Sequence, residues 1–226
     1  MNTAAIRDAM TEPSKSFGTA ARALEWLLVL GVAAVLAWVL RWSAELVRAD
    51  LAFIEPRHQI AQWIKGRERY TAPQWYSAYK GMRQAIALSP GNPVLHEYMG
   101  ALLALRGQSY WHSEVLRRAF FGDARRHQLT SLRLRPGNGR TWAGLALSQH
   151  ALGDDPRSVA RSINSALQYS PHDSRVQRQM AALVLARWAL AEPAQRNWVR
   201  GLYRDEQTRH RLQLLQMAKR YGVRFV

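Results

Sequence analysis

Arginines recur in pairs in the second half of the chain, and they are the residues best suited to bind an anion. A planar guanidinium grips a carboxylate or a phosphate through two parallel hydrogen bonds. The pairs follow one another at intervals of seven or eight residues, close to two helical turns, so on a helix they would form a stripe along one side. We predict an anion-binding stripe made of Arg117, Arg118, Arg125, Arg126, Arg133 and Arg135. A solvated helix face without a ligand is the alternative interpretation.

No other set of residues has the spacing that catalysis or metal binding requires. The chain has no cysteine, which excludes disulfides, thiol nucleophiles and zinc–thiolate sites. None of its seven histidines lies in an HExxH motif, and no two of them lie four residues apart. Phosphate-binding glycine loops and the GxSxG motif do not occur in the sequence. We therefore expect a protein that is not an enzyme and that uses no cofactor or metal.

The chain is strongly basic, with 32 Lys and Arg residues against 16 Asp and Glu residues. A positive field of this size attracts anionic surfaces such as lipid headgroups, acidic glycans and nucleic acid. The sequence contains no recognised nucleic-acid-binding module, and its aromatic residues fall at expected core positions. Anionic glycan or lipid headgroups are therefore the expected non-protein partners, and nucleic acid is not.

An apolar segment near the start of the chain has the composition of a transmembrane helix. Residues 26–40 carry no charge. Trp26 lies at one end of the segment and Trp38 and Trp42 lie at the other, where tryptophans commonly anchor a helix at the two membrane–water interfaces. We predict a polar tail over residues 1–21, a transmembrane helix over residues 22–42 and a helical domain over residues 43–226. A buried core helix and a signal peptide cleaved near Ala37 are the alternatives.

The orientation of this helix does not follow from its flanking charges. Lys and Arg residues near its two ends number three on each side, so the positive-inside rule is undecided. Long domains are translocated largely irrespective of charge, and we therefore favour a translocated C-terminal domain.

The rest of the chain is organised as helices separated by recurring turns. Three short phrases centred on Pro90, Pro136 and Pro171 each end one apolar periodicity and begin another. Proline ends a helix, while the Asn or Asp that follows can cap the next one. The prolines lie 46 and 35 residues apart, near the 34-residue period of tetratricopeptide (TPR) repeats. The chain therefore resembles the TPR family, which implies an all-α domain of stacked helix pairs.

Individual residues match the TPR pattern of large and small positions. The longer of the two intervals leaves a surplus of about twelve residues between Gly107 and Val115, which a loop or a longer second helix could absorb. Ala44–Gly66 is expected to continue the membrane helix, with a bend at Pro56, and a last helix is expected over Thr208–Tyr221. The predicted repeat-core residues are Gly100, Trp142, Leu145, Ala146 and Ala166.

A narrower resemblance rests on the layout and on the end of the chain. Residues 173–179 run into Leu183–Trp188, and residues 218–222 read Ala-Lys-Arg-Tyr-Gly. With the N-terminal anchor and degenerate repeats, these features resemble the small bitopic VpsP-type proteins of bacterial exopolysaccharide biosynthesis clusters. The resemblance implies a role in assembling or coordinating an envelope polysaccharide machine, and it carries over no functional residue. With the favoured orientation, we expect a bacterial inner-membrane protein whose C-terminal domain is periplasmic. A similar layout occurs in an accessory protein of methanol oxidation.

Two functions are therefore expected. The leading hypothesis is a membrane-anchored scaffold that holds other membrane or envelope proteins on the concave surface of its repeats and helps to assemble an exopolysaccharide biosynthesis machine. The alternative is a basic module that binds anionic polysaccharide or lipid headgroups through the arginine stripe.

Overall fold

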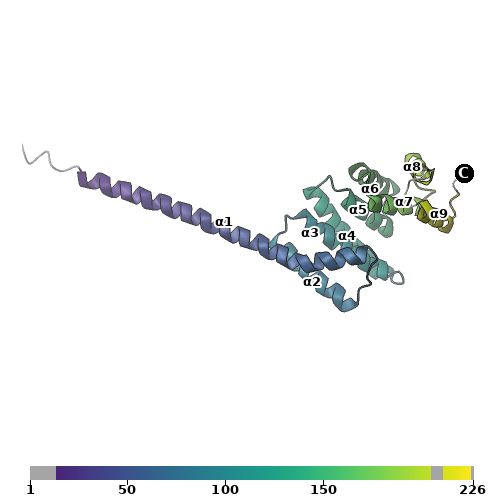
Figure 1. Ribbon diagram of the computed structural model, residues 1–226, viewed down its shortest axis with the longest axis horizontal. Coiled ribbons are helices and arrows are strands. Elements are labelled where there is room, and N and C mark those ends of the chain that lie inside the picture. The colour runs from purple at the N-terminus through teal and green to yellow at the C-terminus, as the bar shows by residue number, and fades with distance from the viewer. Residues whose placement is uncertain (1–13, 205–210, 225–226) are drawn as a thin grey trace, which may run out of the picture. The chain divides into compact units, whose positions relative to one another are not determined.

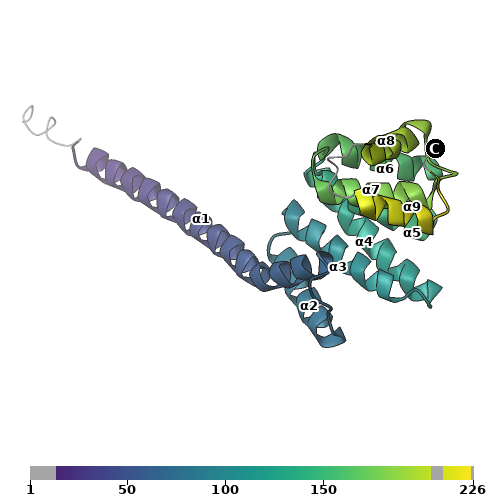
Figure 2. The same ribbon diagram turned by 45° about the vertical axis from the view of Figure 1, so that its right-hand side comes forward.

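The computed structural model describes the backbone of residues 14–204 and 211–224 and, from residue 24 onward, their side chains. Over these residues every regular element is an α-helix and no strand occurs, which confirms the all-α prediction for the described chain. Figure 1 and Figure 2 show the helices from two directions. They are α1 (Ser14–Ile64), α2 (Ala72–Leu88), α3 (Pro93–Ser109), α4 (Glu114–Leu134), α5 (Gly139–Leu152), α6 (Pro156–Tyr169), α7 (Ser174–Ala186), α8 (Pro193–Arg204) and α9 (Arg211–Arg220).

Helix α1 contains the segment predicted to cross a membrane. Among the described residues it is the one helix long and apolar enough to do so, by length and composition. The side chains of residues 24–44 are all exposed, Trp26, Trp38 and Trp42 among them. An apolar helix that no protein covers does not fit the alternative of a core helix. The predicted polar tail lies outside the described residues up to residue 13, and residues 14–21 are already part of α1.

The chain divides into two compact units, Met1–Arg48 and Ala49–Val226. The boundary lies within α1, slightly beyond the predicted end of the membrane segment at residue 42. The helix does not end at Pro56 but continues to Ile64. In the second unit the Pro56 ring packs against α2 at Gly81, where an added Cβ would lie 2.7 Å from Pro56 Cγ. Glycine at this position therefore lets the two helices approach closely.

The helix ends predicted at the three proline turns are confirmed. The turns each contain four residues, at positions 89–92, 135–138 and 170–173, and lie between α2 and α3, α4 and α5, and α6 and α7. The last residue of each turn caps the next helix: Asn92 Oδ1 accepts the N–H of Val94, and Asp173 Oδ1 accepts the N–H of Arg175. Asn138 Oδ1 does the same for the first turn of α5. A side-chain acceptor at this position stabilises a helix by about 1 kcal/mol.

The surplus residues of the longer interval are taken up by helix, not by a loop. Helix α4 has 21 residues against 14 in α6, and α3 has 17 residues against 14 in α5. The connection between α3 and α4 is confined to residues 110–113. Of the two alternatives, the longer second helix is confirmed, because α4 takes most of the added length. The surplus is not confined to residues 107–115, since α3 is also longer than α5. The expected last helix is α9, and its predicted residues 208–210 lie outside the described residues.

Helices of the second unit pack on one another in chain order from α2 to α9. Alternate helices also meet: α3 contacts α5, and α5 contacts α7. These three helices are labelled in Figure 2. One apolar cluster joins the end of α1 to α2 and α3, and a second joins α5 to the helices that follow. Helices α3, α5 and α7 therefore lie next to one another, with residues of all three available to a common surface.

Two histidines meet at the interface of α3 and α4. His96 Nδ1 lies 2.9 Å from His127 Nδ1, and His96 Nε2 lies 3.0 Å from the carbonyl oxygen of Pro90. A carbonyl only accepts, so His96 donates from Nε2 and neutral His96 accepts at Nδ1 from His127. Burial, followed by the neighbouring His96, lowers the pKa of His127 from its ordinary 6.5 to about 4, with Asp123 opposing and Arg126 adding to the shift.

This pair makes stability depend on pH in a defined window. The folded-state pKa of His127 lies below its unfolded value, so the unfolded chain binds the extra proton between about pH 6.5 and 4 and stability falls as the pH decreases through that range. We expect wild-type protein to lose more unfolding free energy between pH 7.5 and 4.5 than the His127→Gln variant does, measured by urea denaturation. His172→Gln, at an exposed site, should behave as wild type. Equal losses in all three proteins would contradict the assignment.

Candidate functional site

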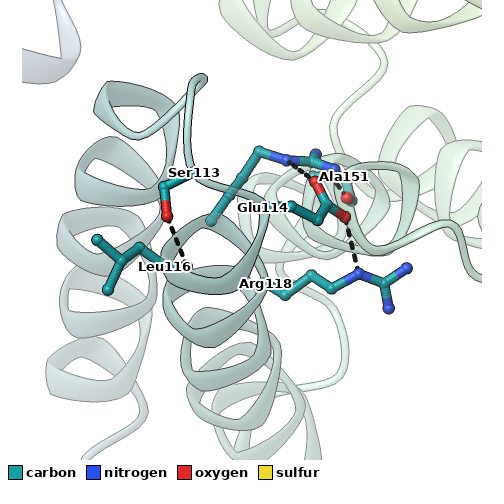
Figure 3. Close-up of polar contacts among 6 residues, drawn as sticks. Ser113, Glu114, Leu116, Arg118 and Ala151 are labelled. Carbon is teal, nitrogen blue, oxygen red and sulfur yellow. Dashed lines mark hydrogen bonds and ion pairs between the residues drawn. The ribbon is translucent and has the colours of Figure 1, made fainter.

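Five of the six arginines of the predicted stripe lie on α4, and Arg135 is its C-cap. Successive residues of a helix point about 100° apart, so the two members of each pair diverge. Arg117 and Arg118 both bind Glu114, at 2.5 and 2.8 Å, and Arg117 Nη1 also donates to the carbonyl oxygen of Ala151 at 2.7 Å. Figure 3 shows the Glu114 carboxylate and the dashed line that joins it to the Arg118 guanidinium. Hydrogen bonds from Arg118 and Arg117 lower the pKa of the Glu114 carboxyl.

The next two arginines of the stripe are also paired. Arg125 binds Asp154 at 2.7 Å, and Arg126 binds Asp123 at 2.6 Å. Asp154 lies between α5 and α6, so Arg125, like Arg117, attaches α4 to the turn that ends α5. Arg133 and Arg135 are exposed and form no ion pair with any described residue. Four of the six predicted guanidiniums are thus engaged within the fold, and the stripe is not a continuous free cationic surface.

A cavity of about 150 Å³ lies on the surface shared by α3, α5 and α7, closed on one side by the end of α1. Its lining is mixed. Small and aliphatic side chains come from α1, α3 and α5, and charged, amide or hydroxyl side chains come from α3, α4, α5 and α7. The lining includes Ile64, Ala101, Leu105, Gln108, Gln128, Arg140, Thr141 and Arg175, with Glu97 and Gln179 beside them. We call this cavity the groove.

Gln128 enters the groove from α4 by passing between two glycines. A Cβ added at Gly100 would lie 2.9 Å from Gln128 Cγ, and one added at Gly144 would lie 3.0 Å from Gln128 Nε2. Only glycine at both positions leaves room for the glutamine in this conformation. Gln128 is 2% exposed, and its Oε1 has no hydrogen-bond partner among the described residues. Thr141, on the first turn of α5, is also buried, and its Oγ1 has no hydrogen-bond partner among the described residues.

Unpartnered buried polar atoms are costly in a folded protein. Each destabilises the native state by about 1–3 kcal/mol relative to a hydrogen-bonded group. Two such atoms, Gln128 Oε1 and Thr141 Oγ1, belong to residues beside the groove, but both atoms are enclosed by the protein and are not accessible from it.

Two guanidiniums line the same groove. Arg140 Nε donates to Asp173 Oδ2 at 2.7 Å, which connects the first turn of α5 to the N-cap of α7. Burial raises the pKa of Asp173, but hydrogen bonds from Arg140 and from two backbone N–H groups outweigh it and the net pKa is lowered. Arg175, half-buried on α7, forms no ion pair with any described residue. Burial, and then the charge of Arg140, lower the pKa of Arg175, and the charge of Asp173 opposes the shift.

The repeat-core residues predicted from the sequence lie around the groove and below it. Gly100, Leu145, Ala146 and Ala166 are buried, whereas Trp142 is only half-buried. Trp142 packs against the apolar cluster of α5–α9, and its Nε1 donates to the carbonyl oxygen of Pro136 at 2.8 Å. The tryptophan therefore holds the turn before α5 and is not a fully enclosed core residue.

Sequence reasoning missed Gln128, Thr141 and Arg175. One signal could have found Gln128: it lies on the face of α4 defined by Phe121, Ala124 and Ser131, which are all buried and spaced three or four residues apart. A long amide on an otherwise apolar or small face is unusual for a core position. No comparable pattern singles out Arg175 among the many arginines of the chain. Among the described residues no group of three or more His, Cys, Asp or Glu side chains could hold a metal ion.

Comparison of the chain with protein-family models and with curated proteins finds no match.

Gln128 provides a test of whether the groove is built for stability. Replacing it with Met, which has similar length and no amide, removes the unpartnered oxygen, so the Gln128→Met variant should be as stable as wild type or more stable by up to about 1 kcal/mol. Gln149→Met is the matched control, because Gln149 Oε1 accepts from buried Ser162 at 2.8 Å and its loss should cost about 1–2 kcal/mol. Urea denaturation measures both. A loss of more than 1 kcal/mol in Gln128→Met would assign the glutamine a structural role.

Proposed function

We propose that this protein is a membrane-anchored, TPR-like scaffold whose groove holds an extended segment of a partner protein. The observation that carries the proposal is the groove itself, which is lined by residues of three alternate helices, α3, α5 and α7. A cavity of about 150 Å³ is smaller than the roughly 300–1,000 Å³ of sites that enclose whole small molecules. It suits one side chain or one chain end of a larger ligand.

The helical arrangement supports a repeat surface of the TPR kind. Helices α3, α5 and α7 each follow a four-residue turn and an N-cap, and consecutive members of this set contact each other. In stacked helix pairs the first helices of successive repeats line one extended surface, which can contact an extended peptide at several points. The groove would be one part of such a surface.

The anchor adds a second property to the scaffold. Helix α1 would place the domain at the bacterial inner membrane, on the periplasmic side, and would raise the effective concentration of partners held in the same membrane. The resemblance to VpsP-type proteins supports assembly of an envelope polysaccharide machine as the process that the scaffold serves.

Binding of anionic polysaccharide or lipid headgroups by the arginine stripe is less well supported. Four of its six arginines are engaged by Glu114, Asp154 and Asp123, and a ligand would have to displace these carboxylates.

The proposed topology predicts the behaviour of two reporter fusions at Val226. Alkaline phosphatase folds only after export and should be active, and green fluorescent protein should be dark. The reverse pattern would place the domain in the cytoplasm and remove the periplasmic part of the proposal.

Site-specific photocrosslinking tests the groove in cells. A photoreactive amino acid at Gln108 or Gln179, which line the groove, should form one discrete protein adduct that mass spectrometry identifies. The same amino acid at Tyr76, which is 58% exposed on α2, should not. Ala101→Trp fills the groove and should abolish the adduct, whereas glutamine at Arg117, Arg118, Arg125 and Arg126 together should leave it nearly intact. Adducts that persist in Ala101→Trp and disappear in the fourfold variant would favour the stripe over the groove.

A further inference from the structure

We infer that helix α9 docks onto the surface of a bilayer that contains anionic phospholipid. Exposed leucines of α9 enter the boundary between headgroups and acyl chains, and basic residues at the end of the helix bind the headgroup phosphates. The inference goes beyond the proposed function, because α9 lines no part of the groove and the partner is a lipid surface and not a protein.

The part of the domain that contains α9 is strongly basic. Residues 174–226 contain eleven Lys and Arg residues against three Asp and Glu residues, which is a net +8 of the chain's +16. Helix α9, yellow in Figure 2, packs on α7 and α8, and none of these three helices contains an acidic residue. Of the three acidic residues, Glu192 accepts from Asn164 Nδ2 at 3.0 Å, and Asp205 and Glu206 lie outside the described residues. The excess of positive charge is therefore not balanced within this part of the fold.

Three cations at the end of α9 have no carboxylate partner within the described chain. Lys219, Arg220 and Arg224 are exposed and form no ion pair with any described residue. We call them the terminal cations. Lys219 and Arg220 lie in the last turn of α9, where positive charge also offsets the negative end of the helix dipole. That structural role requires no external anion, and the experiments below separate it from docking.

The face of α9 that points away from the domain is partly apolar. Leu214 and Ala218 are buried against the domain. Leu212 and Leu215 are instead 76% and 37% exposed. Residues three, four and seven positions apart lie on one side of a helix, so these two leucines share the outer face with Lys219. An exposed apolar stripe beside cations is typical of a helix that lies in a membrane interface.

The combination of leucines and cations selects a bilayer over other anionic partners. Nucleic acid and acidic glycans would pair with the cations but leave Leu212 and Leu215 in water. A bilayer takes up both, because its acyl boundary lies directly beneath charged headgroups. Tyr221, 45% exposed directly after α9, suits the same depth, since its ring is apolar and its hydroxyl polar. Helix α1 has the length and composition to span a membrane, so a bilayer is available to the chain.

Flotation with lipid vesicles tests the docking. The full-length protein is held in phosphatidylcholine nanodiscs, which present no anionic lipid, and is mixed with separate vesicles. The vesicles consist of phosphatidylcholine alone or of an equal mixture with phosphatidylglycerol. We expect the protein to float only with the anionic vesicles and to be released as the salt concentration rises, because salt screens exposed charges.

A charge variant replaces the three terminal cations with glutamine. It should weaken vesicle binding about tenfold or more, since each basic residue near an anionic surface contributes about fivefold. The matched control changes one lysine and two arginines to glutamine in the exposed connection between α1 and α2, where none of them forms an ion pair with a described residue: Lys65, Arg67 and Arg69. The control should weaken binding less than about threefold.

The apolar contact is tested by leucine variants. Leu212→Gln should weaken vesicle binding about threefold to tenfold, because burial of the leucine at the acyl boundary is lost. Leu134→Gln is the matched control at an exposed site on α4 and should change binding less than about twofold. Lys219→Arg should bind as wild type, since a headgroup surface responds to charge. Circular dichroism melts of each variant identify a folding defect.

Quenching by spin-labelled lipid reports whether α9 enters the interface. The chain has no cysteine, so a single cysteine introduced at Gln216 or at Tyr76 can carry a fluorophore without background labelling. A fluorophore at Gln216, exposed on α9, should be quenched by anionic vesicles that contain spin-labelled lipid. A fluorophore at Tyr76, exposed on α2, should not be quenched. A role of the terminal cations confined to the helix dipole would produce no such difference.

Several results would overturn the inference. Absence of flotation, or flotation that the charge variant retains, would remove the docking site from α9. Equal weakening by the charge variant and its control would assign binding to the overall charge of the domain. Weakening by the charge variant alone, with Leu212→Gln unaffected and the Gln216 fluorophore unquenched, would replace the bilayer with a soluble anion. None of these results bears on the groove, which photocrosslinking tests separately.

Discussion

Side-chain oxygens of Asn92, Asn138 and Asp173 accept the first backbone N–H groups of α3, α5 and α7, and the placement of the groove residues depends on these caps. Each cap ends a turn in which proline has stopped the preceding helix. The cap thereby determines which residues occupy the first turn of the next helix. Arg140 and Thr141 are the second and third residues after Asn138, and Arg175 is the second after Asp173, so three polar residues of the groove lie in the first turns that these caps begin.

Two of the caps have a second role that connects alternate helices. Asn138 Nδ2 donates to Glu97 of α3, and Asp173 accepts from Arg140 of α5. The same side chains that begin α5 and α7 therefore also link them to the helices before them. Because each of these side chains makes both contacts, a small domain with a modest apolar core keeps α3, α5 and α7 in register at the surface where a ligand would bind.

Two residues beside the groove, Gln128 and Thr141, each have a buried polar atom without a partner, as do Ser148 and Arg200 elsewhere in the described chain. Gly100 and Gly144 leave space for Gln128, yet the amide oxygen that they admit is unpartnered among the described residues. Conflicts between local chemistry and stability are typical of functional or strained sites. The arginines of α4 show the opposite arrangement. Four of them are paired with nearby carboxylates, and two of these, Arg117 and Arg125, hold α4 against the end of α5.

The sequence alone determined the local features of this protein, and the tertiary structure decided the site. Helix ends at Pro90, Pro136 and Pro171, the caps that follow them, and the apolar segment of α1 were readable because proline geometry, capping and hydropathy act over a few residues. Burial of small residues such as Gly100 and Ala146 followed from the same periodicity. The groove was not readable, since Gln128, Arg140 and Arg175 come from three helices and meet only when those helices pack. The pairing of the arginines was equally hidden, because Asp154 lies 29 residues from Arg125 in sequence and reaches it only across a helix interface.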